Sequence, residues 1–140
     1  PYEVLTVENY NENVGSGMIG EMAEPMEEKP FLQVLKNTMK AGVVKYTDLS
    51  GKPIKKVAVC GGSGQFLLPY AKAVGADVYV TSDFKYHEFF DAENRILIAD
   101  IGHYESEQFT PEIFYEIISN KFPTFASYLT ETNTNPVNYF

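Results

Sequence analysis

Residues 57–64 read Val-Ala-Val-Cys-Gly-Gly-Ser-Gly, a short apolar run followed by a glycine-rich stretch. Such a run, bounded by glycine, is typical of a buried strand. Apolar residues at helical spacing come next, at Phe66, Leu67, Leu68, Ala71 and Val74. Pro69 has no N–H group to donate, so it must lie near the first turn of that helix, which Gly75 closes. The stretch therefore predicts a strand, a glycine turn and a helix.

The alternation of strand and helix continues toward the C-terminus. Residues 77–81 and 95–99 have the composition of strands, and residues 86–92 suit a short helix between them. Gly102-His103 then opens a helical turn. Strands that alternate with helices imply βαβ units, so we expect an α/β fold with a largely parallel sheet.

The C-terminal part is expected to add one helix and one strand. Thr110-Pro111-Glu112 has the composition of a helix start. We expect the inner face of this helix to carry Phe114, Ile117 and Ile118. Residues 125–129 read as a last strand before a polar tail.

The N-terminal part predicts strands at residues 2–10, 18–22 and 43–47. Between the last two, a helix is expected to begin near Pro30 and to end at Gly42. Its apolar residues repeat at helical spacing, at Phe31, Leu32, Leu35 and Met39. Because the chain opens at Pro1 inside a predicted strand and without an initiator Met, we expect it to be part of a longer protein.

Composition excludes several classes of protein. With 140 residues the chain has the usual size of one domain. Its net charge of −8 argues against nucleic acid as a partner, because phosphate binding needs a basic face. No apolar run reaches the ~18 residues of a membrane span. Cys60 is the only cysteine, so no disulfide framework and no cysteine-based zinc site is expected. A cytoplasmic address fits best.

Function is expected at one edge of the predicted sheet. In parallel α/β sheets, ligands bind beyond the carboxyl ends of the strands. The loops at residues 61–64, 82–85 and 102–103 each follow such an end. We therefore expect these loops to lie side by side.

His103 and Glu107 are the candidate metal ligands in the last of these loops. Four helical residues advance about 6 Å and turn slightly more than one revolution, so the two side chains share a face. An imidazole nitrogen and a carboxylate oxygen can then bind one ion at roughly 2.0–2.2 Å. The alternative is a solvated helix face or a simple hydrogen-bonded pair, and the pattern alone leaves both open.

Gly62, Ser63 and Gly64 are candidate substrate-binding residues. They precede a predicted helix start, where free N–H groups favour anions such as phosphate. The stretch lacks the Gly-Lys-Ser/Thr of a Walker loop, and Leu67 stands where a dinucleotide fingerprint has its third glycine. A plain strand-to-helix turn is the alternative.

Polar residues of the middle loop form a third candidate. Asp83, Lys85 and His87 all lie near the same edge. Asp83 is a candidate substrate contact or a partner that orients a metal ligand, and His87 a candidate for proton transfer. The alternative is a helix cap at Ser82 or Asp83 followed by an ordinary exposed helix.

Four strings, in this order, resemble the C-terminal half of the NIF-three-like dinuclear metal-centre family. They lie at residues 57–64, 75–87, 102–107 and 134–137. The most specific is Gly-His-Tyr-Glu-Ser-Glu at 102–107. Many members of this family are labelled GTP cyclohydrolase type-two homologues. One departure is Ser82, where members often have glycine.

The resemblance implies a layered α/β/α domain with a mixed, largely parallel sheet, here truncated. Residues 1–14 would be the end of an inserted domain and a re-entry strand, and residues 15–140 the C-terminal α/β lobe. His103 and Glu107 match the ligands that this lobe gives to two divalent ions, either zinc, iron or manganese. The remaining His and Asp ligands belong to the N-terminal half. The family also implies a homo-oligomer, a toroidal hexamer when full length, acting on a small-molecule substrate.

Three functions remain open at this point. The first is half of a metal-dependent hydrolase of the GTP-cyclohydrolase or phosphoesterase type, in which the fragment alone is inactive. The second is a metal-binding scaffold or adaptor without turnover. The third is a nucleotide-binding βαβ domain that uses only the glycine loop.

Overall fold

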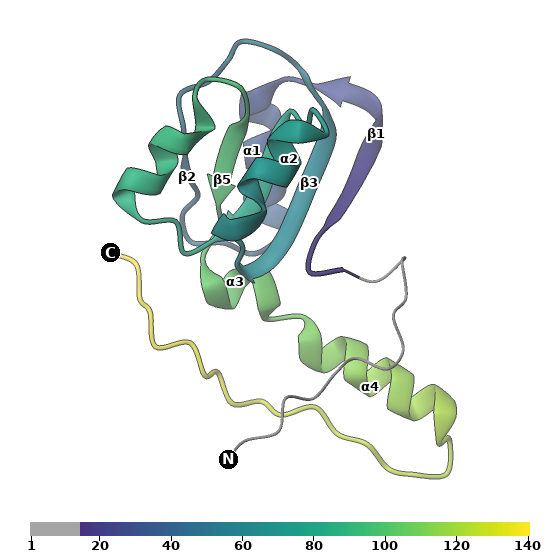
Figure 1. Cartoon of the computed structure of the whole chain (residues 1–140). Coiled ribbons are helices and arrows are strands. Elements are labelled where there is room, and N and C mark those ends of the chain that lie inside the picture. The colour runs from purple at the N-terminus through teal and green to yellow at the C-terminus, as the bar shows by residue number, and fades with distance from the viewer. Residues whose placement is uncertain (1–14) are drawn as a thin grey trace, which may run out of the picture.

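A computed structural model describes residues 15–140 of the chain (Figure 1). The strand expected at residues 2–10 and the assignment of residues 1–14 to an inserted domain lie outside this range. Among the described residues, no helix has the length and apolarity needed to cross a bilayer.

A single sheet of five strands forms the centre of the described part, in the order β1-β3-β4-β5-β2. The strands are β1 (Met18–Met26), β2 (Lys45–Tyr46), β3 (Ile54–Ser63), β4 (Val78–Ser82) and β5 (Leu97–Asp100). The three central strands run parallel to one another. Each edge strand is antiparallel to its neighbour. The sheet is therefore mixed and parallel in its middle, as predicted.

Helices cover both faces of the sheet (Figure 1). On one face lies α1 (Glu28–Thr38), and on the other lie α2 (Leu68–Ala73) and the 3-10 segment η2 (Tyr86–Ala92). The core under α1 includes Phe31, Leu32, Val78, Val80, Leu97 and Ala99. The core on the opposite face includes Leu68, Ala71, Tyr79, Ala92 and Ile98. Neighbours along β4 and β5 thus bury opposite faces, which explains their unbroken apolar runs and confirms the α/β/α layering.

The glycine-rich stretch differs from its prediction. β3 continues to Ser63, so the first residues of the expected turn belong to the strand. A 3-10 turn, η1 (Gln65–Leu67), follows before α2 begins with Pro69 in its first turn. Val59, expected in a fully buried strand, is 40% exposed. Its neighbour β1 is an edge strand whose side chains are mostly exposed, so this side of the sheet is incompletely covered.

Other helix and strand boundaries differ by a few residues from those predicted from the sequence. α1 ends at Thr38 rather than at Gly42, and the strand expected at residues 43–47 pairs only as the short β2. η2 has the predicted bounds but is a 3-10 helix.

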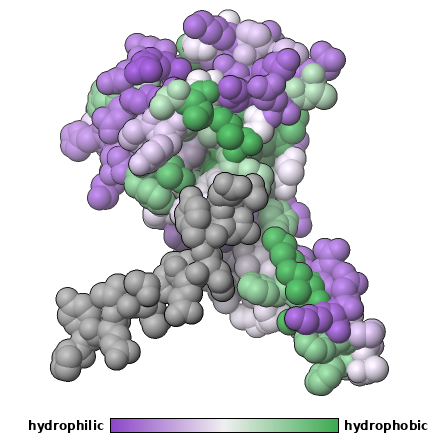
Figure 2. All heavy atoms as spheres, turned by 45° about the vertical axis from the view of Figure 1, so that its right-hand side comes forward, coloured by the Kyte–Doolittle hydropathy of each residue, from purple (hydrophilic) through white to green (hydrophobic). Residues whose placement is uncertain are grey.

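The C-terminal helix contradicts the prediction most clearly. α4 (Thr110–Lys121) forms, yet none of its residues is buried. Its expected inner face is exposed at Phe114, Ile117 and Ile118. Figure 1 shows α4 projecting from the layered body, and Figure 2 shows hydrophobic residues on the surface of this arm. The strand expected at residues 125–129 does not form, because no neighbouring strand of the described chain lies beside it.

Candidate functional site

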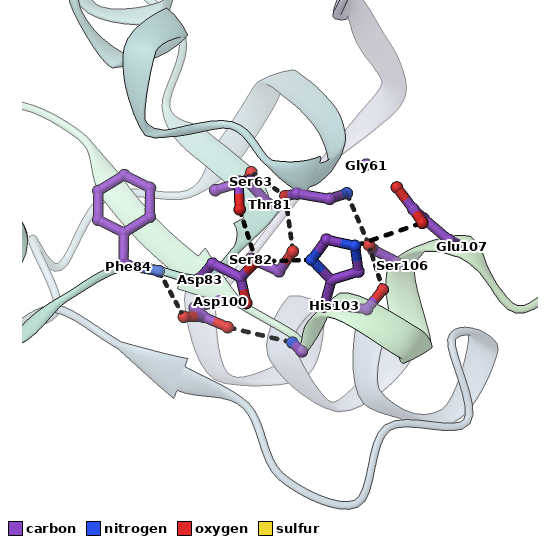
Figure 3. Close-up of polar contacts among 12 residues, drawn as sticks. Gly61, Ser63, Thr81, Ser82, Asp83, Phe84, Asp100, His103, Ser106 and Glu107 are labelled. Atoms are coloured by element: carbon purple, nitrogen blue, oxygen red, sulfur yellow. Dashed lines mark hydrogen bonds and ion pairs between the residues drawn. The ribbon is translucent and has the colours of Figure 1, made fainter. Parts of the chain in front are cut away.

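The three loops predicted to share one edge of the sheet do meet there (Figure 3). Ser82, at the end of β4, donates its hydroxyl to the Gly62 carbonyl at 2.6 Å. The Gly62 N–H group donates in turn to the Ser106 hydroxyl at 2.8 Å. Ser106 lies on α3 (His103–Glu107), the helical turn that follows β5. Side-chain hydrogen bonds therefore lock the end of β3 to both neighbouring loops.

The start of α3 places His103 at this edge. Gly102 precedes it with a φ of +95°, a backbone conformation that glycine adopts without strain. The Ser106 hydroxyl donates to the His103 carbonyl at 2.8 Å, which ties the turn together. As the spacing predicts, the side chains of His103 and Glu107 then lie on one face of the turn.

The imidazole of His103 lies between two carboxylates (Figure 3). Its Nδ1 is 2.6 Å from Asp83 Oδ2, and its Nε2 is 3.4 Å from Glu107 Oε2. An ionised carboxylate can only accept, so Nδ1 must be the donor to Asp83. In the neutral imidazole, Nε2 then carries a lone pair that faces the Glu107 carboxylate. Two acceptors at this distance need a cation or a proton between them.

The electrostatics of the three groups are coupled. The hydrogen bond that His103 Nδ1–H donates to the Asp83 carboxylate raises the pKa of the imidazole above its ordinary value. Hydrogen bonds from Ser63 and then from His103 lower the pKa of the Asp83 carboxyl. In the metal-free chain, these shifts favour an imidazolium between two carboxylates.

The separation of Nε2 and Oε2 also fits a shared metal ion. Two ligand atoms at about 2.0–2.2 Å from one ion, at a near-tetrahedral angle, lie about 3.3–3.6 Å apart. The observed 3.4 Å falls in this range. Within residues 15–140, no cluster of three or more His, Cys, Asp or Glu side chains could hold a metal ion. The described chain therefore offers two ligands with suitable geometry and an incomplete coordination shell.

Asp100, which the sequence reasoning did not single out, holds two of the loops together. Its carboxylate accepts from the Phe84 N–H at 3.0 Å and from the Gly102 N–H at 3.1 Å. It also pairs with Lys45 Nζ at 2.7 Å, and its side chain is only 1% exposed. The sequence feature that could have identified Asp100 is its place at the carboxyl end of a buried strand. An unpaired charge is costly there, so an acidic residue at that position is expected to have bonding partners.

The candidate substrate-binding residues Gly62, Ser63 and Gly64 form hydrogen bonds within the chain. The Gly62 N–H is bonded to Ser106, and the Ser63 hydroxyl donates to Asp83 at 2.5 Å. Gly64 is buried, and its carbonyl accepts from the Tyr79 hydroxyl at 2.6 Å. Substrate contact by these residues stays a prediction.

His87 is placed apart from the other candidates. It lies exposed on η2, with its ring 5.1 Å from that of Tyr86. Among the described residues it makes no hydrogen bond to Asp83, His103 or Glu107. A role in proton transfer stays a prediction.

A cavity of about 1140 Å³ opens beside His103. Its walls come from the sheet edge, from α3 and α4, and from the C-terminal tail. Residues of the site on its lining are Lys45, Asp83, Asp100, His103 and Glu107. The space is large enough for a small-molecule ligand.

A protein-family model and curated relatives match most of this chain. The family described as Duf34/NIF3 (NGG1p interacting factor 3) matches residues 2–136. A "GTP cyclohydrolase 1 type 2 homolog" of Staphylococcus epidermidis is 36% identical over 99% of this chain and 40% of its own length. The Bacillus subtilis protein of the same name is 31% identical over 99% of this chain and 38% of its own length.

A solved structure agrees in fold. The crystal structure of a Bacillus cereus protein related to NIF3 superposes with a TM-score of 0.78 at 29% identity. The match covers 96% of this chain and 38% of that one. The chain thus spans about two-fifths of the length of the curated relatives that it matches.

Proposed function

This chain belongs to the Duf34/NIF3 family, and we propose that it is the C-terminal part of a dinuclear metal-binding protein. In this proposal His103 and Glu107 are metal ligands. The complete protein is a metal-dependent hydrolase of the GTP-cyclohydrolase or phosphoesterase type. The name of the relatives supports the GTP-cyclohydrolase reaction. The site geometry supports the two ligands.

One observation carries the proposal: His103 Nε2 faces Glu107 Oε2 at 3.4 Å while Nδ1 is bonded to Asp83. A hydrogen bond would need a proton on Nε2, which only the imidazolium has in this arrangement. A divalent cation satisfies both lone pairs at once, and it leaves the Asp83 bond intact. The half-exposed side chains allow an ion and further ligands to approach from outside.

The remaining ligands would come from the part that the relatives have and this chain lacks. Zinc sites use three or four protein ligands, whereas the described chain supplies two of suitable geometry. When bound, a pair of divalent ions supplies a water with a pKa lowered to about 7 and stabilises charge on a phosphoryl or carbonyl oxygen. The cavity beside His103 would receive the substrate.

Metal content of the full-length protein tests the ligand assignment. Glu107→Gln keeps the size of the side chain and removes its charge, so bound metal should fall markedly in elemental analysis. Glu116→Gln, on the exposed surface of α4, is the matched control and should keep wild-type metal content. Unchanged stoichiometry in Glu107→Gln would refute the assignment.

Turnover separates the hydrolase from a scaffold. The metal-loaded full-length protein should open the GTP ring or cleave phosphoesters, and His103→Ala should abolish that activity. Full metal occupancy without turnover on a substrate panel would support a metal-binding scaffold instead. The chain alone should bind zinc weakly, and tight stoichiometric binding would contradict the proposal.

A homo-oligomer is part of the same proposal. The exposed apolar side chains of α4 support it, because a stable soluble protein normally covers such a surface. Either the remainder of the longer protein or another copy could provide this cover. Sedimentation of the full-length protein tests for the oligomer.

A further inference from the structure

We propose that Asp83 is a positioning residue, which fixes the tautomer and the direction of His103 so that Nε2 is presented to the metal ion. The inference rests on the proposed function, because it concerns the same site. Of the two roles that the sequence leaves open for Asp83, substrate contact and orientation of a metal ligand, it selects the second and names His103 Nε2 as the atom presented to the metal.

The carboxylate of Asp83 is held from two sides. Its Oδ2 accepts from the Ser63 hydroxyl at 2.5 Å and from His103 Nδ1 at 2.6 Å. Ser63 ends β3, Asp83 follows β4, and His103 opens α3. Three elements therefore converge on one oxygen atom, and Figure 3 shows the imidazole aligned between Asp83 and Glu107.

The backbone of Asp83 is also constrained. Its φ is +62°, in the left-handed region that is uncommon for residues other than glycine, although Asp is among those enriched there. Both neighbours in the chain are buried and anchored. Ser82 donates to the Gly62 carbonyl, and the Phe84 N–H donates to Asp100. Such strain persists only where the surroundings enforce it, and it is frequent at functional sites.

This arrangement has a direct consequence for metal binding. A carboxylate that accepts from Nδ1–H leaves the lone pair on Nε2, and it raises the basicity of the imidazole as a ligand. It also stops rotation of the ring, which would turn Nε2 away from Glu107. Because Oδ2 already has two donors, Asp83 serves His103 rather than acting as a third metal ligand through that atom.

The first test needs no metal. Long-range ¹H–¹⁵N correlation spectra of the metal-free chain, at an alkaline pH where the imidazole is neutral, report which nitrogen of His103 carries the proton. We expect the Nδ1–H tautomer in the wild type. In Asp83→Gly, which removes the carboxylate and relaxes the left-handed backbone, we expect a shift toward Nε2–H. A wild type with Nε2–H, or a tautomer unchanged in Asp83→Gly, would overturn the inference.

The second test measures zinc affinity of the full-length protein. Loss of a group that orients a ligand typically weakens metal binding about 10–100-fold, and we expect a loss of this size in Asp83→Gly and Asp83→Asn. Glu93→Gln is the matched control, since Glu93 is also an exposed carboxylate in the left-handed region, with a φ of +53°. It should bind zinc as the wild type does.

The outcomes separate this inference from the proposed function. If His103→Ala keeps wild-type zinc affinity, the proposed function fails, and the positioning role fails with it. If His103→Ala loses zinc but both Asp83 variants bind it normally, only the positioning role is overturned. Loss in all three variants, together with the tautomer shift, supports both.

Discussion

A Cβ atom placed on Gly62 would stand 2.6 Å from Oε1 of Glu107, closer than real contacts of this kind allow. Gly62 also has a φ of +64°. The close approach exists because the Gly62 N–H is bonded to Ser106, one residue before Glu107. The end of β3 and the candidate ligand are thus packed directly against each other.

Gly62→Ala should therefore displace the Glu107 carboxylate and weaken metal binding. A non-glycine residue in the left-handed region also costs roughly 1–3 kcal/mol of stability. The expected result in the full-length protein is a folded variant with a lowered melting temperature and reduced zinc affinity. Thermal unfolding and zinc titration measure the two effects separately.

Gly51→Ala is the matched control for backbone strain. Gly51 has a similar φ of +73°, but a Cβ built on it meets no atom within 4 Å. It should lower stability to a similar extent and leave zinc affinity unchanged. Equal zinc affinity in Gly62→Ala and Gly51→Ala would show that Glu107 does not depend on Gly62.

Asp100→Ala should loosen the loops that carry Asp83 and His103. The change leaves the buried Phe84 N–H group without its acceptor, at about 1–3 kcal/mol, and it also removes the acceptor of the partly buried Gly102 N–H group. We expect a clear loss of stability in chemical denaturation, with broadened amide signals for residues 82–85 and 102–103 in NMR spectra.

Lys45→Met separates the hydrogen bonds of Asp100 from its ion pair. The Lys45 side chain is 54% exposed, so its pairing with Asp100 is partly screened by solvent. The variant keeps both backbone hydrogen bonds, so its free energy of unfolding should fall less than that of Asp100→Ala. A larger loss of stability in Lys45→Met than in Asp100→Ala would mean that the unpaired buried charge of Asp100 affects stability more than its hydrogen bonds to the loops do.

The layered core was predictable because its signals are local and repeated. β4 and β5 are short apolar runs between helices, and both faces of each strand are buried. The exposure of Phe114 was not predictable. An apolar helix face predicts that the face is buried, but it does not identify the surface that covers it. Within the described chain nothing does.

In the candidate site, too, one contact could be predicted from the sequence and another could not. The pairing of His103 with Glu107 follows from helical spacing alone, once α3 forms. The bond between Asp83 and His103 joins residues 20 apart in the sequence and depends on a positive φ at Asp83. The sequence placed both residues at the same edge, but the contact is set by loop geometry, which residue patterns do not reveal.

The titration of His103 gives a prediction for the metal-free chain. The bond to Asp83 raises the pKa of the imidazole, so this pair stabilises the fold fully below the unfolded value of about 6.5. That contribution disappears as the pH rises through the higher folded value. An NMR titration of the His103 ring protons should give a midpoint above 6.5, and Asp83→Asn should lower it. An unchanged midpoint in Asp83→Asn would assign the shift to Glu107 instead.

The exposed face of α4 leads to a last prediction, from a comparison of the short chain with the full-length protein. Ile117 is 54% exposed, so Ile117→Ser should change the unfolding free energy of this chain by less than about 0.5 kcal/mol.

Ile98, with 0% exposure, is the matched core position, and Ile98→Ala should cost about 2–5 kcal/mol in both proteins. If the remainder of the longer protein or another copy covers α4, Ile117→Ser becomes destabilising only in the full-length protein. Chemical denaturation of the four variants measures this difference directly. Equal, small effects of Ile117→Ser in both proteins would mean that α4 stays exposed, and the apolar face would then no longer support an oligomer.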